Sequence, residues 1–164
     1  MLREEFLECR QTLEKFENRI KRRKVVIFFG GVDQSNETLK AIQGLSTTDK
    51  NIKFSVILGE NNPNKEQVIS LCNRLANFTP SINVSDFAAR LAGSMLYIGA
   101  CGSTSLERSC CGLPSIVSST ALNQEEGAQH LHNIGALQYL GKSENCHPHD
   151  YREAFETLFN SNHS

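Results

Sequence analysis

The sequence predicts an α/β protein built on a parallel β-sheet with helices on both of its faces. Runs such as 24–29 and 53–58 are apolar almost throughout, which is typical of strands covered on both sides. Segments with helical spacing of apolar residues alternate with these runs along the chain. Strands that alternate with helices form parallel sheets, because each crossover helix returns the chain to the same edge.

Residues 1–20 carry apolar side chains at steps of four and three, which is the spacing of one stripe on a helix. The stripe consists of Leu2, Phe6, Cys9, Leu13, Phe16 and Ile20. We therefore divide the chain into an amphipathic linker helix over 1–22 and one domain over 23–164. The stripe fits a helix packed on its own domain and equally a face that docks on another domain or subunit.

Apolar runs and helix signals set the elements of the domain. Strands are predicted at 24–29, 53–58, 80–84, 95–98, 115–118 and 136–140. Helices are predicted at 35–43, 64–77, 85–92, 123–135 and 150–160, with another opening at 103. Ser35 and Ser85 stand where helices begin, because a hydroxyl can cap the free N–H groups there. Gly112 and Pro114 stop the helix that opens at 103.

The stretch 98–114 carries the strongest functional signal. Its strand breaks on Gly99–Gly102, and Ser103–Ser105 then open a helix with Glu107 in its first turn. Free N–H groups and the helix dipole favour an anion there, and Gly102 lets a ligand approach the backbone. A carboxylate at 107 would repel a phosphate but can accept hydrogen bonds from ribose hydroxyls. The same residues also fit an ordinary helix cap, which is the commoner explanation of such a local pattern.

Four polar loops are expected to meet at one edge of the sheet. They are Gly30–Asp33, Val84–Phe87, Gly99–Ser105 and the loop after Ser118 that includes Asn123 and Gln124. Ligands of open parallel sheets bind outside the carboxyl ends of the strands, where all four loops lie. Glycines, hydroxyls and one acid at that edge favour a nucleoside diphosphate.

Composition excludes several other classes of function. The chain has 164 residues, 39% of them hydrophobic and 21% charged, which suits one globular domain. A net charge of −1 gives no sign of a nucleic-acid or anionic-membrane partner. The sequence shows no membrane-spanning run and no secretory signal, so we expect a cytoplasmic protein. Neither GxGxxG nor the complete Walker A pattern occurs, because Gly141-Lys142-Ser143 has Ala136 where that pattern needs its first glycine. This argues against nicotinamide chemistry and ATP hydrolysis.

The cysteines and histidines suggest no further chemistry. The six cysteines form no CxxC pair, so we expect reduced thiols. Cys101 has no evident base nearby and is expected to fill a tight turn. The run Cys146-His147-Pro148-His149 crowds its ligands into one turn without a second pair at zinc spacing. We therefore expect a surface loop there and no metal.

Five blocks of sequence carry a family resemblance. They are VVIFFGGVD at 25–33, ILG at 57–59, VSDF at 84–87, GACGSTSLER at 99–108 with GLP at 112–114, and NQE at 123–125. In this order they resemble the C-terminal half of the pseudaminic-acid pathway UDP-sugar hydrolase, PseG, and its spore-coat relative SpsG. These are similar to the UDP-binding domain of MurG-type GT-B glycosyltransferases. The resemblance covers nearly the whole chain and implies a Rossmann-like fold and a role in surface-polysaccharide or nonulosonic acid biosynthesis.

The resemblance also implies where a UDP-sugar binds. Gly30 and Gly31 would face the diphosphate or the sugar, and the backbone of Val84 would meet the uracil. Asn123 and Gln124 would reach the sugar. No cofactor beyond the UDP-sugar is implied, and no catalytic residue is assigned within this chain.

The central block would hold the diphosphate and the ribose. The resemblance places the diphosphate at Gly102, Ser103, Thr104 and Ser105, and gives the ribose hydroxyls to Glu107. Cys101 departs from the glycine that is usual in this turn.

One departure concerns the catalytic half. Enzymes of this family carry their catalytic histidine in an N-terminal domain, across the cleft from UDP. This chain lacks that domain, and Leu2–Phe6 resembles the linker that follows it, so the expected partner is an N-terminal domain or a partner subunit. The chain would then be an excised domain, a truncated product or half of a split enzyme. Three functions stay open: a PseG-like hydrolase, a MurG- or SpsG-like glycosyltransferase, and a non-catalytic nucleotide-sugar-binding module.

Overall fold

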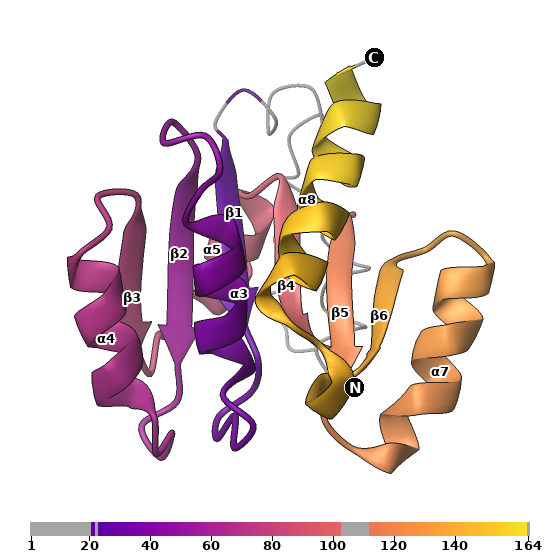
Figure 1. Ribbon diagram of the computed structural model, residues 1–164, viewed down its shortest axis with the longest axis horizontal. Coiled ribbons are helices and arrows are strands. Elements are labelled where there is room, and N and C mark those ends of the chain that lie inside the picture. Colours follow the sequence, from indigo (N-terminus) through magenta and orange to yellow (C-terminus); the bar gives the residue numbers. More distant parts are fainter. Residues whose placement is uncertain (1–20, 22, 103–111, 164) are drawn as a thin grey trace.

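The computed structural model describes residues 21, 23–102 and 112–163, which form a six-stranded parallel sheet with its helices. The strands are β1 (Lys24–Phe28), β2 (Lys53–Leu58), β3 (Phe78–Ile82), β4 (Leu96–Ala100), β5 (Ser115–Ser119) and β6 (Gln138–Lys142). Their order is β3-β2-β1-β4-β5-β6, and every neighbouring pair is parallel (Figure 1). Strand β1 therefore lies inside the sheet. The chain adds β2 and β3 on one side of β1 and then crosses over to add β4, β5 and β6 on the other side. Such a reversal opens a crevice at the carboxyl edge.

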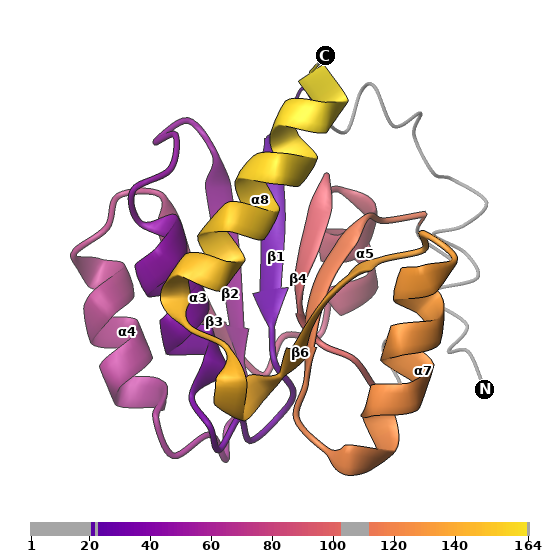
Figure 2. The ribbon, with the colours of Figure 1, turned by 45° about the vertical axis from the view of Figure 1, so that its right-hand side comes forward.

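Helices cover both faces of the sheet, as predicted. They are α3 (Glu37–Leu45), α4 (Lys65–Asn73), α5 (Phe87–Ala92), α7 (Leu122–Asn133) and α8 (Pro148–His163), with a short 3₁₀ helix η1 (Ser143–Asn145). Helices α3, α4 and α8 pack on one face, and α5 and α7 pack on the other (Figures 1 and 2). The chain leaves the edge strand β6, and Figure 2 shows α8 then crossing in front of β1.

Each central strand contributes side chains to two hydrophobic cores, one on each face of the sheet. Ile27 and Phe54 pack toward α3 and α8, where they meet Tyr151. Val26 and Tyr97 point the other way, into the core under α5. All five side chains are at most 1% exposed. Because successive residues of β1 enter opposite cores, the strand has no polar side to alternate with, which explains its unbroken apolar sequence.

Several boundaries differ from the predicted ones by a few residues. Strand β3 begins at Phe78 rather than at 80, because the Phe78 ring stacks on Phe54 at a centroid distance of 4.4 Å. Pro80 is tolerated inside it because β3 is an edge strand. Helix α4 ends at Asn73 instead of 77, and β6 runs over 138–142 instead of 136–140.

Gly99 lies inside β4 and not in the turn predicted after 98. A Cβ at this position would stand 1.9 Å from the carbonyl oxygen of Phe28 and 2.4 Å from the Tyr97 hydroxyl. That hydroxyl donates a hydrogen bond to the Phe28 carbonyl at 2.8 Å. The glycine is therefore required by the close contact between β4 and β1.

The remaining predictions on the fold divide by region. The predicted helix over 1–20 and the one opening at 103 lie outside the described residues. Cys72, Cys101 and Cys146 are buried, and no disulfide joins them to one another. Within the described part of the chain, no helix combines the length and apolar character needed to cross a bilayer.

Candidate functional site

The described candidate residues all follow strands at the carboxyl edge of the sheet. They are Gly30 and Gly31 after β1, Val84 after β3, Gly102 after β4, and Asn123 and Gln124 in the first turn of α7 after β5. The predicted convergence of four loops at one edge is thus confirmed for these residues. Ser103, Thr104, Ser105 and Glu107 lie outside the residues that the structure describes.

Gly102 and Gln124 stand next to each other although they come from different loops. A Cβ on Gly102 would lie 3.3 Å from Nε2 of Gln124. The Gln124 side chain is held by its carbonyl oxygen, which accepts hydrogen bonds from the Thr120 N–H at 3.0 Å and the Thr120 hydroxyl at 3.3 Å. Its amide group is therefore fixed with the NH₂ directed at the loop after β4, as a positioned donor for a ligand.

The loop after β1 offers backbone with open space beside it. Gly30 has φ of +89°, which side-chain-bearing residues rarely adopt. No atom lies within 4 Å of a Cβ position on Gly30 or Gly31. On its other side this loop touches the loop after β2, because a Cβ on Gly59 would stand 2.0 Å from the Gly31 carbonyl oxygen. The loop after β2 thus packs against one side of this loop, and the space beside Gly30 and Gly31 is open on the other side.

The N-terminus of α3, next to this loop, is closed by Asp33 and not by Ser35 as predicted. The Asp33 carboxylate accepts hydrogen bonds from the N–H of Glu37 and of Thr38, both at 2.9 Å, and from the Thr38 hydroxyl at 2.6 Å. Asp33 is buried, and burial raises the pKa of its carboxyl group while these hydrogen bonds oppose the rise. The helix end is already occupied by the protein's own acid, so a phosphate cannot use these donors.

Val84 is half-buried and belongs to the core under α5. The same core contains the ring pair Phe28 and Phe87, whose centroids are 5.2 Å apart. Just before it, Asn83 donates from its side chain to Glu60 at 2.8 Å and from its backbone to the Leu58 carbonyl at 3.1 Å. The backbone at 84 is thus held against the end of β2, in a fixed position from which it could meet a flat base.

A pocket of about 380 Å³ opens at the same edge, between β5, β6 and the start of α3. Most of the residues that line it carry hydroxyl, amide or charged groups. The lining polar side chains are Gln34, Ser35, Ser119, Thr120, Glu125, Lys142, Ser143 and Glu144. The Lys142 ammonium lies 3.6 Å from the Glu125 carboxylate across the pocket. Such a lining suits a polar ligand with several hydroxyl groups.

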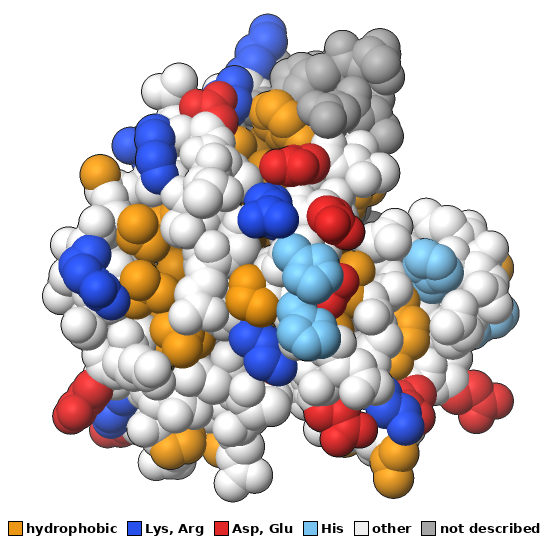
Figure 3. Space-filling model, viewed as in Figure 1, with side chains coloured by type: hydrophobic (Ala, Val, Ile, Leu, Met, Phe, Trp, Pro, Cys, Tyr) orange, Lys and Arg blue, Asp and Glu red, His pale blue; other side chains and the backbone are white. Residues whose placement is uncertain are grey.

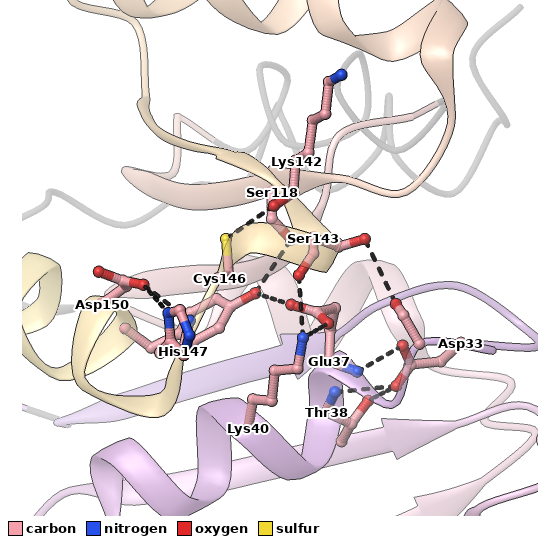
Figure 4. Close-up of polar contacts among 12 residues, drawn as sticks. Asp33, Glu37, Thr38, Lys40, Ser118, Lys142, Ser143, Cys146, His147 and Asp150 are labelled. Atoms are coloured by element: carbon pink, nitrogen blue, oxygen red, sulfur yellow. Dashed lines mark hydrogen bonds and ion pairs between the residues drawn. The ribbon is translucent and has the colours of Figure 1, made fainter.

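A buried network supports this pocket from the side of α8 (Figure 4). The Tyr151 hydroxyl lies 2.7 Å from Glu37 and 3.1 Å from the Ser118 hydroxyl. The Lys40 ammonium pairs with Glu37 at 2.7 Å and donates to the Ser143 carbonyl at 3.0 Å. Burial raises the pKa of the Glu37 carboxyl group, and the bonds from Lys40 and Tyr151 counter it. The network ties α3, β5 and the segment after β6 into one unit.

Sequence reasoning missed Asp33, Glu37 and the pocket residues of 142–144. Asp33 ends the glycine loop after β1, and an acid four residues before a helical stripe is itself a capping signal. The contact of Glu37 with Tyr151 carries no local signal, because the two residues lie 114 positions apart. The polar run Ser118–Thr120, at the end of the buried strand β5, is a usable hint at the pocket.

Comparison by sequence identifies a curated relative but no family. No protein-family model matches the chain. The uncharacterized protein MJ1062 of Methanocaldococcus jannaschii is 26% identical over 161 residues, which are 94% of this chain and 31% of that protein. The chain thus spans about a third of the length of this curated relative.

Among solved structures the chain is similar to glycosyltransferases of the GT-B type. MurG of Acinetobacter baumannii matches with a TM-score of 0.68 and 18% identity, over 87% of this chain and 44% of that one. Anabaena Alr3699/HepE, solved with UDP and glucose, matches at 0.65 and 14%, over 99% and 44%. The C-terminal CMP-Kdo binding domain of WaaA from Acinetobacter baumannii matches at 0.60 and 12%, over 94% and 88%. The fold is therefore the Rossmann-like C-terminal domain of the GT-B architecture.

Proposed function

We propose that this chain is the nucleotide-sugar-binding half of an enzyme of GT-B architecture, and that its nucleotide is UDP. The observation that carries the proposal is the meeting of Gly102 with the fixed Gln124 amide at the carboxyl edge. Open parallel sheets bind their ligands at this edge. A solved structure of the same fold holds UDP and glucose, which supports the choice of ligand.

Each part of the ligand has a proposed place. The uracil meets the backbone at Val84, and the diphosphate approaches Gly102 and the open loop at Gly30 and Gly31. Asn123 and Gln124 face the sugar, whose hydroxyl groups the pocket between β5 and β6 could also hold. Ser103, Thr104 and Ser105 complete the diphosphate site, and Glu107 takes the ribose hydroxyls.

The proposed reaction is hydrolysis of a UDP-linked deoxy-diacetamido sugar, as in PseG. The oxygen of water bonds to the anomeric carbon, and the bond from that carbon to the diphosphate oxygen breaks. UDP leaves with the bonding electron pair, and the water gives up a proton to a base. Donors at the diphosphate stabilise the charge that develops on the leaving group. The residues proposed in this chain bind and orient, and the base is assigned to a partner domain.

A glycosyltransferase is the second candidate, because solved structures similar to this chain are glycosyltransferases. In that case a sugar hydroxyl replaces water as the nucleophile. Both reactions need a second domain across the cleft. The carboxyl edge exposes Val32 (44%), Ile82 (42%) and Leu122 (80%), three large apolar side chains that such a domain could cover. Release of UDP from a UDP-sugar, with and without an acceptor, separates the two reactions once the partner is present.

Ligand-dependent melting tests the proposal on the isolated chain. Saturating UDP is expected to raise the melting temperature and ADP to raise it less, because ligand binding to the folded state stabilises it by mass action. Glu107→Ala should weaken UDP binding by about 1–3 kcal/mol, the cost of losing a charged acceptor. Glu126→Ala, which removes an exposed acid from α7, is the charge-matched control and should bind UDP like the parent. An unchanged melting temperature at millimolar UDP would contradict the proposal.

A further inference from the structure

The start of α8 gathers three metal-ligating side chains on the surface, on the face opposite α5 and α7. They are His147, His149 and Asp150, and their ligand atoms all lie within 4.8 Å of one another. Figure 3 shows two histidines next to each other near the centre of this face, with acidic side chains against them. None of the three lines the carboxyl-edge pocket, so this cluster is separate from the proposed nucleotide site.

Each imidazole of this cluster has a nitrogen close to zinc-ligand spacing from one oxygen of Asp150. Nδ1 of His147 lies 3.6 Å from Oδ2 of Asp150, and Nε2 of His149 lies 3.4 Å from Oδ1 of the same residue. Two ligands of one tetrahedral zinc ion are roughly 3.4 Å apart, because each stands about 2.0–2.2 Å from the metal. The two imidazole rings are nearly parallel, at an angle of 11° with centroids 5.5 Å apart. Both rings can therefore direct a nitrogen to the carboxylate at once.

Asp150 is held in place by the backbone, as metal-binding carboxylates commonly are. Its Oδ2 accepts the N–H of His147 at 2.7 Å, which caps the first turn of α8 (Figure 4). Its Oδ1 stays available to a metal without loss of that cap. Both histidines are exposed, with 69% and 53% of their side chains accessible, so a hydrated ion can reach them.

The structure changes the ligand set that the sequence offered. Cys146, which the motif put beside the histidines, is 3% exposed, and its thiol points back to the Lys142 carbonyl oxygen at 3.4 Å. Asp150, four residues further on, takes its place. The crowding that argued against a metal is relieved because the chain turns into α8 at Pro148 and brings 147, 149 and 150 around one point.

We propose that His147, His149 and Asp150 form a zinc site that clamps the first turn of α8. Two imidazoles and one carboxylate are borderline ligands, which suit Zn²⁺ or Co²⁺ better than Mg²⁺ or Ca²⁺. Water completes the fourth position. The bound ion joins the residue before α8 to its first turn, next to Tyr151 of the buried network, and thereby stabilises the folded chain. This proposal is independent of the proposed nucleotide function.

The test uses the 164-residue chain without an affinity tag and with its thiols kept reduced. Titration with Zn²⁺ is expected to show one site, and Co²⁺ at that site should give a visible d–d absorption band. His147→Ala/His149→Ala should weaken binding at least about tenfold and remove the band. Asp150→Asn keeps an oxygen for the His147 N–H and should also weaken binding. His130→Ala, in α7, is the matched control and should bind like the parent.

Melting curves give the second measurement. Zn²⁺ should raise the melting temperature of the parent and of His130→Ala, and should leave that of the double variant unchanged. Without metal, the double variant should melt within a few degrees of the parent, because both side chains are exposed. Equal zinc affinity of parent and double variant, as thiol binding would give, overturns the proposal, and so does a parent that binds no Zn²⁺.

Discussion

The N-termini of α3 and α7 both stand at the carboxyl edge, after β1 and β5, but their ends differ. At α3 the Asp33 carboxylate is 6% exposed and bonded to two backbone N–H groups of the helix. At α7 the residue before the helix is Ala121, and no side chain caps it. Gln124 turns its carbonyl oxygen back to Thr120 and keeps its NH₂ free to face Gly102. One end is closed by the protein itself, and the other presents donors to the crevice.

The two helix starts perform different tasks at the same edge. The loop Gly30–Asp33 before α3 and the loop after Ser118 before α7 are both among the predicted ligand loops, and of these two only the first contains glycine. At α3 the helix start serves stability, because an acid of the loop itself fills it. At α7 and the neighbouring Gly102 the helix start is left for binding. An anion should therefore be sought between Gly102 and α7, with the loop at Gly30 and Gly31 as a backbone wall.

Loss of the Asp33 cap should give the largest change. Asp33→Ala removes three hydrogen bonds and leaves buried donors unpaired, so we expect about 2–4 kcal/mol lower free energy of unfolding in urea. Asp33→Asn keeps one acceptor oxygen, so its free energy of unfolding should lie between those of the parent and of Asp33→Ala. Asn123→Ala, at the open end of α7, should change stability by no more than about 0.5 kcal/mol. Equal losses at 33 and 123 would remove the contrast between the two ends.

The buried acid next to the closed end should make stability depend on pH. The pKa of Glu37 is raised above its ordinary value of 4.5, so the folded chain holds this proton more tightly than the unfolded chain. Relative to Glu37→Gln, the parent should therefore be most stable below about pH 4.5 and lose stability as pH rises through the raised pKa. The slope cannot exceed about 1.4 kcal/mol per pH unit for one proton. Urea unfolding of both proteins from pH 4 to 8 measures it, and a flat difference would contradict the buried-acid argument.

A methyl group at the open end should mainly affect binding. Gly102→Ala places its Cβ 3.3 Å from Nε2 of Gln124, so the amide must shift by a few tenths of an ångström. We expect less than about 1 kcal/mol lost in stability and about a tenfold weaker affinity for UDP, measured by calorimetry. Gly127→Ala in α7 meets no atom within 4 Å and serves as the control. It should gain up to about 1 kcal/mol in stability and bind UDP like the parent.

Much of the fold could be predicted because its signals are local. The limits of β2 were predicted at 53–58 and are observed there, since an apolar run between polar turns leaves little choice. Helix α5 likewise begins near its predicted cap. Where a tertiary contact decides, prediction failed by a few residues: the stacking of Phe78 on Phe54 extends β3 backward, and Gly99 joins a strand because β1 passes close to it.

The candidate site was predicted as a set of loops but not as a set of contacts. The edge on which Gly30, Gly102 and Gln124 lie follows from strand direction alone, so alternation of strands and helices was sufficient. The closing of α3 by Asp33 depends on a left-handed backbone at 33 with φ of 51°, which no periodicity indicates. The pocket at Lys142 and Ser143 forms because β6 lies beside β5 in the sheet. The sequence pattern alone does not reveal that pairing.

The crossing of α8 over the sheet has a consequence for biosynthesis. The apolar face of β1 and α3 is covered only by Tyr151 and Phe155 of α8, which lie more than a hundred residues later in the chain. During translation this apolar face stays uncovered until α8 has left the ribosome. Contacts so distant in sequence also form slowly. A nascent chain that ends before Tyr151 would therefore be a natural client for chaperones that bind exposed apolar surfaces.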